Sequence, residues 1–184
     1  AGVRSVAMLV MDAARWLQLK TEGAVHERAR RFGGIAALLT AVLFVAAGVL
    51  LYSFVSGYQI TSAVATEGPS NPLLKTVDRH AGAWFANYAD YPVLYVVPLL
   101  GVGGAVLAWM GMAGRKPLAA LLASGASIAG IVLSVGVSMF PFILPSSVDP
   151  RASLTVWDSS SSHLTLFIML VCVIIFLPII LAYT

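Results

Sequence analysis

The sequence predicts an all-α integral membrane protein, a polytopic bundle of four clear transmembrane helices preceded by a charged first helix that looks truncated. Hydrophobic residues make up 59% of the 184 residues and charged residues only 10%, whereas soluble domains carry about 25% charged residues. The mean hydropathy is +0.91. Several uncharged runs are about 20 residues long, enough to cross a bilayer, and backbone groups in lipid must bond within their own segment. These runs are therefore expected to be helices in one transmembrane region.

The first segment, residues 1–19, is mostly apolar but contains Arg4, Asp12 and Arg15. Their spacing places all three side chains on one helical face. Asp12 and Arg15 can form a buried ion pair, which lowers the cost of charge inside a membrane. Two interpretations remain open: a polar track that faces a helix bundle, or a stripe that faces water or a partner.

Four later segments are expected to cross the membrane: residues 35–55, 92–112, 118–140 and 164–183. At a rise of 1.5 Å per residue, about 20 residues cover a hydrocarbon core of about 30 Å. Pro98 lies inside the second of these spans and is expected to kink it. Cys172, in the last span, is expected to be a small apolar filler.

Small residues recur every four positions in two spans. In lipid, such ridges let the backbone of another helix approach closely. We expect the second ridge to contact a partner subunit, and the alternative is a water or ion path lined by its serines. The first ridge contains Gly101, Gly104, Ala105 and Ala108, and the second contains Ala126, Gly130, Ser134 and Ser138.

Two segments between the spans are expected on the outer side. In residues 56–91, a turn at 69–72 precedes residues 72–88, for which we expect a short interfacial helix capped by Asn71. In residues 141–163, three prolines exclude a regular helix at the start. The first segment also carries an expected aromatic belt: Trp84, Phe85, Tyr88 and Tyr91.

The basic residues follow the positive-inside rule, which places loops rich in Lys and Arg in the cytoplasm. Six lie in the two expected inner loops and three in the outer segments. The net charge of +3 is thus explained by topology, and no nucleic-acid partner is expected. The inner residues are Lys20, Arg28, Arg30, Arg31, Arg115 and Lys116, and the outer ones are Lys75, Arg79 and Arg151.

The chemistry-bearing residues predict no catalytic, cofactor-binding or metal site in this chain. His26, His80 and His163 all lie outside the middle of the spans, whereas a membrane haem needs an axial ligand such as His or Met. Met169, in the last span, is expected to pack. His163 could shuttle protons beside Asp158; alternatively, Asp158 and the neighbouring serines cap the last helix.

Several motifs resemble subunit II of the cytochrome bd-type quinol oxidases, including the cyanide-insensitive branch. The most specific are residues 139–142, 144–147 and 152–158, and residues 19–23, 70–73 and 81–84 add to them. The likeness covers nearly the whole chain and corresponds to the C-terminal half of that subunit; both ends of the sequence also look cut. The signature outer loop comprises Pro145, Ser146, Ser147, Trp157 and Asp158; Trp157 is expected to anchor at the interface.

The resemblance implies a two-subunit oxidase in the bacterial inner membrane. Subunit I of that family carries haem b, haem d and the quinol site, oxidises quinol, reduces dioxygen to water and builds a proton gradient. This chain would then be a haem-free scaffold in contact with lipids. The resemblance is also compatible with a structural quinone or lipid bound to the chain and with small single-span accessory subunits. The family's proton-path acids belong to the N-terminal half. Other classes are a transporter fragment with a polar pathway on the first helix and an assembly factor.

Overall fold

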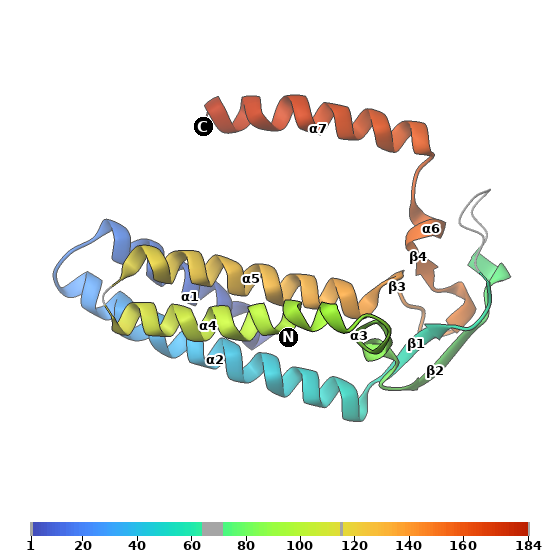
Figure 1. Cartoon of the computed structure of the whole chain (residues 1–184), viewed down its shortest axis with the longest axis horizontal. Helices are drawn as coiled ribbons and strands as arrows, with labels where there is room; N and C mark the ends of the chain where they lie inside the picture. Colours follow the sequence, from blue (N-terminus) through green and yellow to red (C-terminus); the bar gives the residue numbers. More distant parts are fainter. Residues whose placement is uncertain (1, 64–71, 115, 184) are drawn as a thin grey trace.

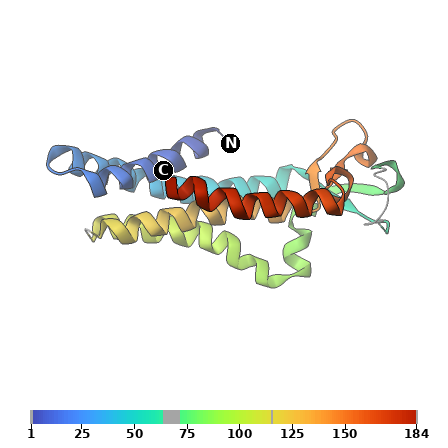
Figure 2. The ribbon, with the colours of Figure 1, turned by 90° about the horizontal axis from the view of Figure 1, so that it is seen from above.

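The computed structural model describes residues 2–63, 72–114 and 116–183. The long helices run side by side as an elongated bundle, except for the last one, which stands apart from the others (Figure 1). Short strands gather at one end of the bundle, whereas the α1–α2 and α4–α5 turns lie at the other end (Figure 2). The bundle consists of α1 (Gly2–Lys20), α2 (Ala24–Phe54), α4 (Val96–Ala113) and α5 (Pro117–Met139), and the separate helix is α7 (His163–Tyr183).

The prediction of four membrane-spanning helices is confirmed. Among the described residues, the helices long and apolar enough to cross a bilayer are Ala24–Phe54, Pro92–Ala113, Leu118–Met139 and His163–Tyr183. Helix α1 is not one of them, as expected from its charged side chains. It packs instead along α2 and reaches α5, and the face that it buries there consists of Ala7, Met11, Ala14, Arg15 and Gln18.

Close backbone contact holds α4 against α5. A Cβ atom added at Gly104 would lie 2.7 Å from the Ser127 backbone nitrogen, and one at Gly130 would lie 2.8 Å from the Gly101 Cα. Real side chains do not fit at such distances, so these positions require glycine. Ser127 Oγ also donates a hydrogen bond of 2.7 Å to the Gly101 carbonyl. The small residues thus act as the close-packing positions that membrane helices favour.

Pro98 occupies the first turn of α4, directly after the 3₁₀ turn η3 (Pro92–Tyr95). The backbone N–H groups of a first turn have no partner within their own helix. A proline is therefore tolerated there without interrupting the α-helical ladder. The irregularity of this span lies at the change from 3₁₀ to α-helix at Val96.

The segment expected to form one interfacial helix over residues 72–88 does not do so, and this prediction is wrong. Strand β1 (Ser56–Ile60) pairs antiparallel with β2 (Val77–Ala81), with Gly57 opposite His80. Gly82 then takes a positive φ of 80°, a conformation that glycine adopts without steric cost. Pairing with a distant strand overrides local helix propensity here. The rest is short: η1 (Pro72–Leu74), η2 (Ala83–Phe85) and α3 (Ala86–Asp90).

Asn71 and the turn at 69–71 lie outside the described residues, so the predicted helix cap is not placed. The expectation that prolines exclude a regular helix at the start of the second outer segment is confirmed. That segment forms β3 (Phe142–Leu144), η4 (Pro150–Ala152), β4 (Leu154–Thr155) and α6 (Val156–Ser159), with β3 antiparallel to β4.

We call these two segments together the outer cap, after the side of the membrane on which the sequence predicts them; it comprises residues 56–63, 72–91 and 141–162. Its apolar centre contains Tyr58, Val77, Trp84 and Phe142, contributed by both segments. Tyr88 is also buried, whereas Tyr91 is exposed. Trp84 and Tyr88 are therefore core residues of the cap rather than members of the predicted aromatic belt.

Helix α7 has no buried residue in this chain. It begins at the outer cap and extends back along the direction of the bundle without packing on it (Figure 1). Cys172 and Met169 are both exposed on it. An uncharged helix of 21 residues that leaves its whole surface uncovered is suited to lipid or to other membrane helices.

Candidate functional site

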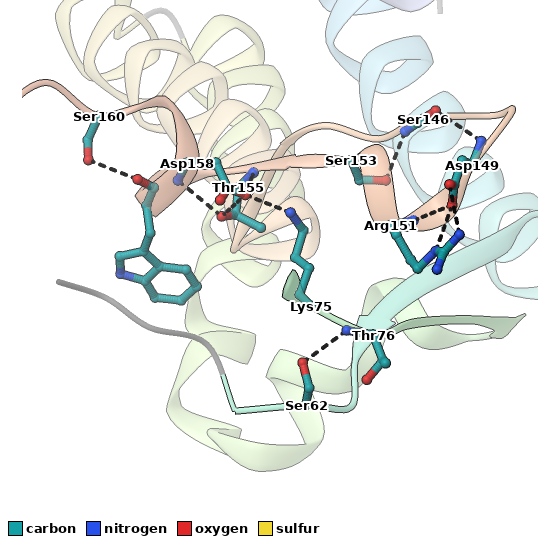
Figure 3. Close-up of polar contacts among 11 residues, drawn as sticks. Ser62, Lys75, Thr76, Ser146, Asp149, Arg151, Ser153, Thr155, Asp158 and Ser160 are labelled. Atoms are coloured by element: carbon teal, nitrogen blue, oxygen red, sulfur yellow. Dashed lines mark hydrogen bonds and ion pairs between the residues drawn. The ribbon is translucent and has the colours of Figure 1, made fainter. Parts of the chain in front are cut away.

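A buried ion pair joins the two segments of the outer cap. Lys75 Nζ lies 2.7 Å from Asp158 Oδ2, and the two side chains are only 3% and 9% exposed. Lys75 follows η1, and Asp158 belongs to α6, which is 83 residues further along the chain. Figure 3 shows the lysine reaching across to the carboxylate. Buried charges of this kind are stable only when paired and hydrogen-bonded.

The position of Asp158 is fixed by a capping box at the start of α6. Asp158 Oδ2 accepts hydrogen bonds from the Thr155 backbone N–H at 3.1 Å and from Thr155 Oγ1 at 2.7 Å. Burial alone would raise the pKa of the Asp158 carboxyl, but the hydrogen bonds from Lys75 and Thr155 outweigh it and lower the pKa below its ordinary value. The carboxylate is thus held in its charged form.

The signature outer loop is tied down by its serines. The Ser146 backbone N–H donates to Ser153 Oγ at 2.9 Å, and the Ser146 carbonyl accepts from the Tyr58 hydroxyl at 3.0 Å. Pro145 is half-buried, whereas Ser147 is exposed. Ser146 therefore connects the second segment of the outer cap to strand β1 of the first, and Ser153 closes the loop on itself (Figure 3).

Trp157 and His163 flank the start of the last helix. Trp157 is half-buried and packs edge-on against Phe140, with ring centroids 6.0 Å apart. His163 is the first residue of α7 and is exposed. Ser162 Oγ accepts from the Thr165 backbone N–H at 3.4 Å, so a serine caps α7 as expected. The part of that interpretation that gave Asp158 the same role is wrong, because its carboxylate is held by Lys75 and Thr155.

The charged stripe of α1 faces the interior of the bundle. Arg15 is 0% exposed, and Asp12 Oδ1 accepts a hydrogen bond of 2.9 Å from Ser124 Oγ on α5. Arg15 and Asp12 do not form an ion pair with each other; the three ion pairs among the described residues involve other side chains. Arg15 Nη1 instead donates to the carbonyl of Met11 at 2.6 Å. The stripe therefore faces the helix bundle, as the polar-track interpretation expected, but the direct ion pair between Asp12 and Arg15 that the sequence predicted does not form.

Arg15 also has unmet hydrogen-bonding capacity. Its Nε and Nη2 atoms, and Oε1 of Gln18 one turn later, are buried without a hydrogen-bond partner in the described chain. Arg4, nearer the start of α1, places its guanidinium 5.9 Å from the ring centre of Phe44 on α2. Buried polar groups normally have partners, so this face of α1 is the least satisfied polar region of the bundle.

The predicted packing ridge of α5 is used largely inside the chain. Gly130 lies against Gly101 of α4, and Ser134 is buried with its Oγ donating to the Gly130 carbonyl at 2.7 Å. Ala126 and Ser138, the other two members, are half-buried. The expectation that Gly130 and Ser134 contact a partner subunit is wrong, because α4 and the outer cap already cover them.

No cluster of three or more His, Cys, Asp or Glu residues suited to a metal ion occurs in residues 2–63, 72–114 and 116–183. His26 lies in the first turn of α2, with Nδ1 3.2 Å from the Gln18 carbonyl. His80 lies on β2, with Nε2 2.9 Å from Gln59 Oε1. The histidines are therefore spread over three separate places.

Sequence reasoning missed the pairing of Lys75 with Asp158. One local signal was available, because Thr155 and Asp158 fit the Ser/Thr-x-x-Asp/Glu pattern of a capping box. That pattern predicts the start of α6 and the fixed carboxylate. Nothing in the local sequence indicates that a lysine 83 residues earlier completes the arrangement.

Comparison with known proteins finds relatives over the whole length of the chain. The model of the family described as cytochrome bd terminal oxidase subunit II matches residues 1–184. The chain is 43% identical over 183 residues to "Probable cytochrome oxidase subunit 2" of Haemophilus influenzae and 42% identical over 184 residues to "Cytochrome bd-I ubiquinol oxidase subunit 2" of Escherichia coli.

These alignments include 100% of this chain but only 48% of each relative. The chain thus spans about half the length of the curated relatives it matches. The resemblance drawn from the sequence motifs is confirmed by these matches. The chain belongs to the cytochrome bd terminal oxidase subunit II family.

Proposed function

We propose that this chain is part of a haem-free structural subunit of a respiratory oxidase that oxidises quinol and reduces dioxygen to water. The observation that carries the proposal is the family match over residues 1–184. This match supports membership in an oxidoreductase complex and, with it, a partner oxidase subunit. The name of the Escherichia coli relative, a ubiquinol oxidase subunit, supports quinol as the reductant of the complex.

The geometry of the outer cap supports a scaffolding role. The signature polar groups of Ser146 and Asp158 bond to Tyr58 and Lys75, which belong to the same chain. These two bonds join the two outer segments. Groups used in this way set the shape of a surface, and a partner subunit can then dock on that surface. We assign no catalytic step to them.

The cofactors and further partners follow from the same proposal. Haem b and haem d would lie in the partner subunit, whose reaction would build a proton gradient across the bacterial inner membrane. Small single-span accessory subunits, lipids and a structural quinone are compatible with the exposed α7 surface. The residues described in this chain contribute shape and insulation rather than haem ligands.

The transporter alternative loses its support. It depended on a pathway along the Arg4, Asp12 and Arg15 face of α1, and the family match places the chain among oxidase subunits instead. In the bundle, Asp12 is engaged by Ser124, and Arg15 bonds to its own helix. The assembly-factor interpretation is replaced for the same reason.

The test is purification of the full-length subunit, carrying an affinity tag, from its native membranes in mild detergent. We expect one larger partner to co-purify and a reduced-minus-oxidised spectrum to show haem b and haem d bands. Separation of the two subunits should then leave all haem with the partner. A colourless preparation without a partner would refute the oxidase proposal, and haem that stays with the tagged subunit would refute its haem-free role.

A further inference from the structure

A groove opens between α2 and α4 at the end of the bundle opposite the outer cap. Its volume is about 380 Å³, and Arg30, Arg31, Ile35, Leu38 and Trp109 line it. We propose that this groove binds one anionic phospholipid, with its phosphate on the two arginines and an acyl chain along the apolar wall. The inference needs only a membrane surface beside these arginines and does not depend on the oxidase proposal.

The mouth of the groove is positively charged. Arg30 Nη2 lies 3.1 Å from Glu27 Oε2, one turn away on the same helix, and both side chains remain partly exposed. Arg31 is exposed, and no carboxylate among the described residues forms an ion pair with it. The mouth therefore carries two guanidinium groups, of which only that of Arg30 pairs with a carboxylate in the described part of the chain. A phosphodiester anion complements that surplus, since guanidinium binds phosphate oxygens through paired hydrogen bonds.

The wall of the groove is apolar and accessible. Ile35 is 57% exposed, Leu38 41% and Trp109 40%. Arg31, Ile35 and Leu38 follow each other at helical spacings of four and three, so they form one line along α2, from charge to hydrocarbon. A lipid lying along this line would therefore place its headgroup at the arginines and its acyl chain along Ile35 and Leu38.

Gly34 keeps the floor of the groove open. A Cβ atom at this position would lie 3.5 Å from Trp109 Cδ1 and 3.9 Å from Met112 Cε, which are ordinary contact distances. The helices therefore do not require glycine here for close packing, unlike at Gly130. A long side chain at position 34 would extend into the space between Trp109 and α2 and shorten the groove.

This combination favours a phospholipid over free phosphate. Free phosphate would use the arginines but gain nothing from Ile35, Leu38 and Trp109. An uncharged lipid would gain from the wall but leave Arg31 without a counter-charge. Tryptophan and arginine together at a membrane boundary are also typical of headgroup contacts.

The test uses the full-length protein, together with any partner subunit that co-purifies, delipidated in mild detergent and titrated by native mass spectrometry. The probes are phosphatidylglycerol and phosphatidylcholine with identical acyl chains, each with and without inorganic phosphate. We expect the wild-type complex to bind one more phosphatidylglycerol than the Arg30→Gln/Arg31→Gln complex. The affinity at that site should fall about fivefold for each arginine removed, as expected for a surface charge beside an anionic lipid.

Arg28→Gln is the matched control, because Arg28 is an exposed arginine of the same helix that does not line the groove. It should leave lipid binding unchanged. Gly34→Leu should weaken the phosphatidylglycerol site while keeping all the charges. Equal binding of the two lipids, unchanged binding in the double arginine variant, or full competition by inorganic phosphate would each overturn the proposal. The arginine variants alter exposed side chains, so the test stands even if Gly34→Leu does not assemble.

Discussion

Lys75 Nζ and Asp158 Oδ2 lie 2.7 Å apart at the junction of the two outer segments, with both side chains nearly excluded from solvent. The contact joins Lys75, which follows η1 in the first outer segment, to Asp158, which lies in α6 just before the last helix α7. Because Thr155 holds the carboxylate independently of the lysine, the site is organised from the Asp158 side. The predictions for Lys75 variants and for the pH dependence through Asp158 follow from this arrangement.

Lys75→Met should destabilise the outer cap by about 3–5 kcal/mol, the usual effect of removing one partner of a buried ion pair. The reason is that the Asp158 carboxylate stays buried without its cation. Thermal unfolding of the purified complex measures the change. Lys116→Met is the control, since Lys116 is exposed, and should change the melting temperature little.

The double variant Lys75→Met/Asp158→Leu sharpens the same test. It removes both charges, so its destabilisation should be smaller than the sum of the two single variants. Strict additivity of the single effects would show that the two side chains do not interact energetically. An unchanged melting temperature for Lys75→Met would contradict the importance of the pair.

The stability of the outer cap should depend on pH through Asp158. Its folded-state pKa is lowered below the ordinary value of 3.8, so the unfolded chain takes up a proton more readily than the folded one. The stabilisation is therefore fully present above about pH 5 and is lost as the pH falls below 3.8 through the lowered folded-state pKa.

Melting curves of the wild type and of Asp158→Asn, recorded from pH 7 down to the acid limit of the complex, check this dependence. The gap between the two melting temperatures should be constant at neutral pH and shrink in the acid window. Asp90→Asn, at an exposed outer carboxylate, is the control. A gap that widens on acidification would show that the sign is wrong.

Gly130→Ala should destabilise the packing of α4 on α5 by about 1–3 kcal/mol, as overpacking usually does. The added methyl group would lie 2.8 Å from Gly101 Cα and 2.9 Å from the Leu100 carbonyl carbon, and backbone atoms cannot move aside cheaply. Gly130→Leu should prevent assembly of a fully haem-loaded complex. Yield and melting temperature are the measurements.

Gly136→Ala is a control on the same helix, since a Cβ atom there meets nothing within 4 Å. It should be neutral or stabilise α5 by about 0.5–1 kcal/mol, because alanine favours helix over glycine. If the Gly130 and Gly136 variants behave alike, the close contact between α4 and α5 does not control stability.

Asn87→Ala should loosen the outer end of α5 by about 1–3 kcal/mol. Asn87 Nδ2 donates to the carbonyl of Val137 at 2.7 Å and to that of Phe140 at 2.6 Å, which the helix end cannot satisfy by itself. Losing the amide leaves both acceptors without this donor. Faster hydrogen exchange over residues 136–142, without a change at the opposite end of α5, is the expected signature. Uniform exchange along α5 would contradict a local role.

Sequence alone determined which segments cross the membrane. An uncharged run of about 20 residues has one way to satisfy its backbone in lipid, so composition and length predicted all four spanning helices. The small residues of α4 and α5 likewise predicted close helix contact, because a residue without a large side chain lets any neighbouring helix backbone approach closely. The motifs around Ser146 and Asp158 also led to the correct family.

Tertiary structure decided everything that depends on distant segments meeting. Residues 77–81 pair as a strand because β1 lies beside them, although their local pattern suggested a helix. Asp158 contacts Lys75 rather than the last helix, and Arg15 bonds to its own backbone rather than to Asp12. Short outer segments have little intrinsic preference, and their conformation and ion pairs are set by packing against chain that is far away in sequence.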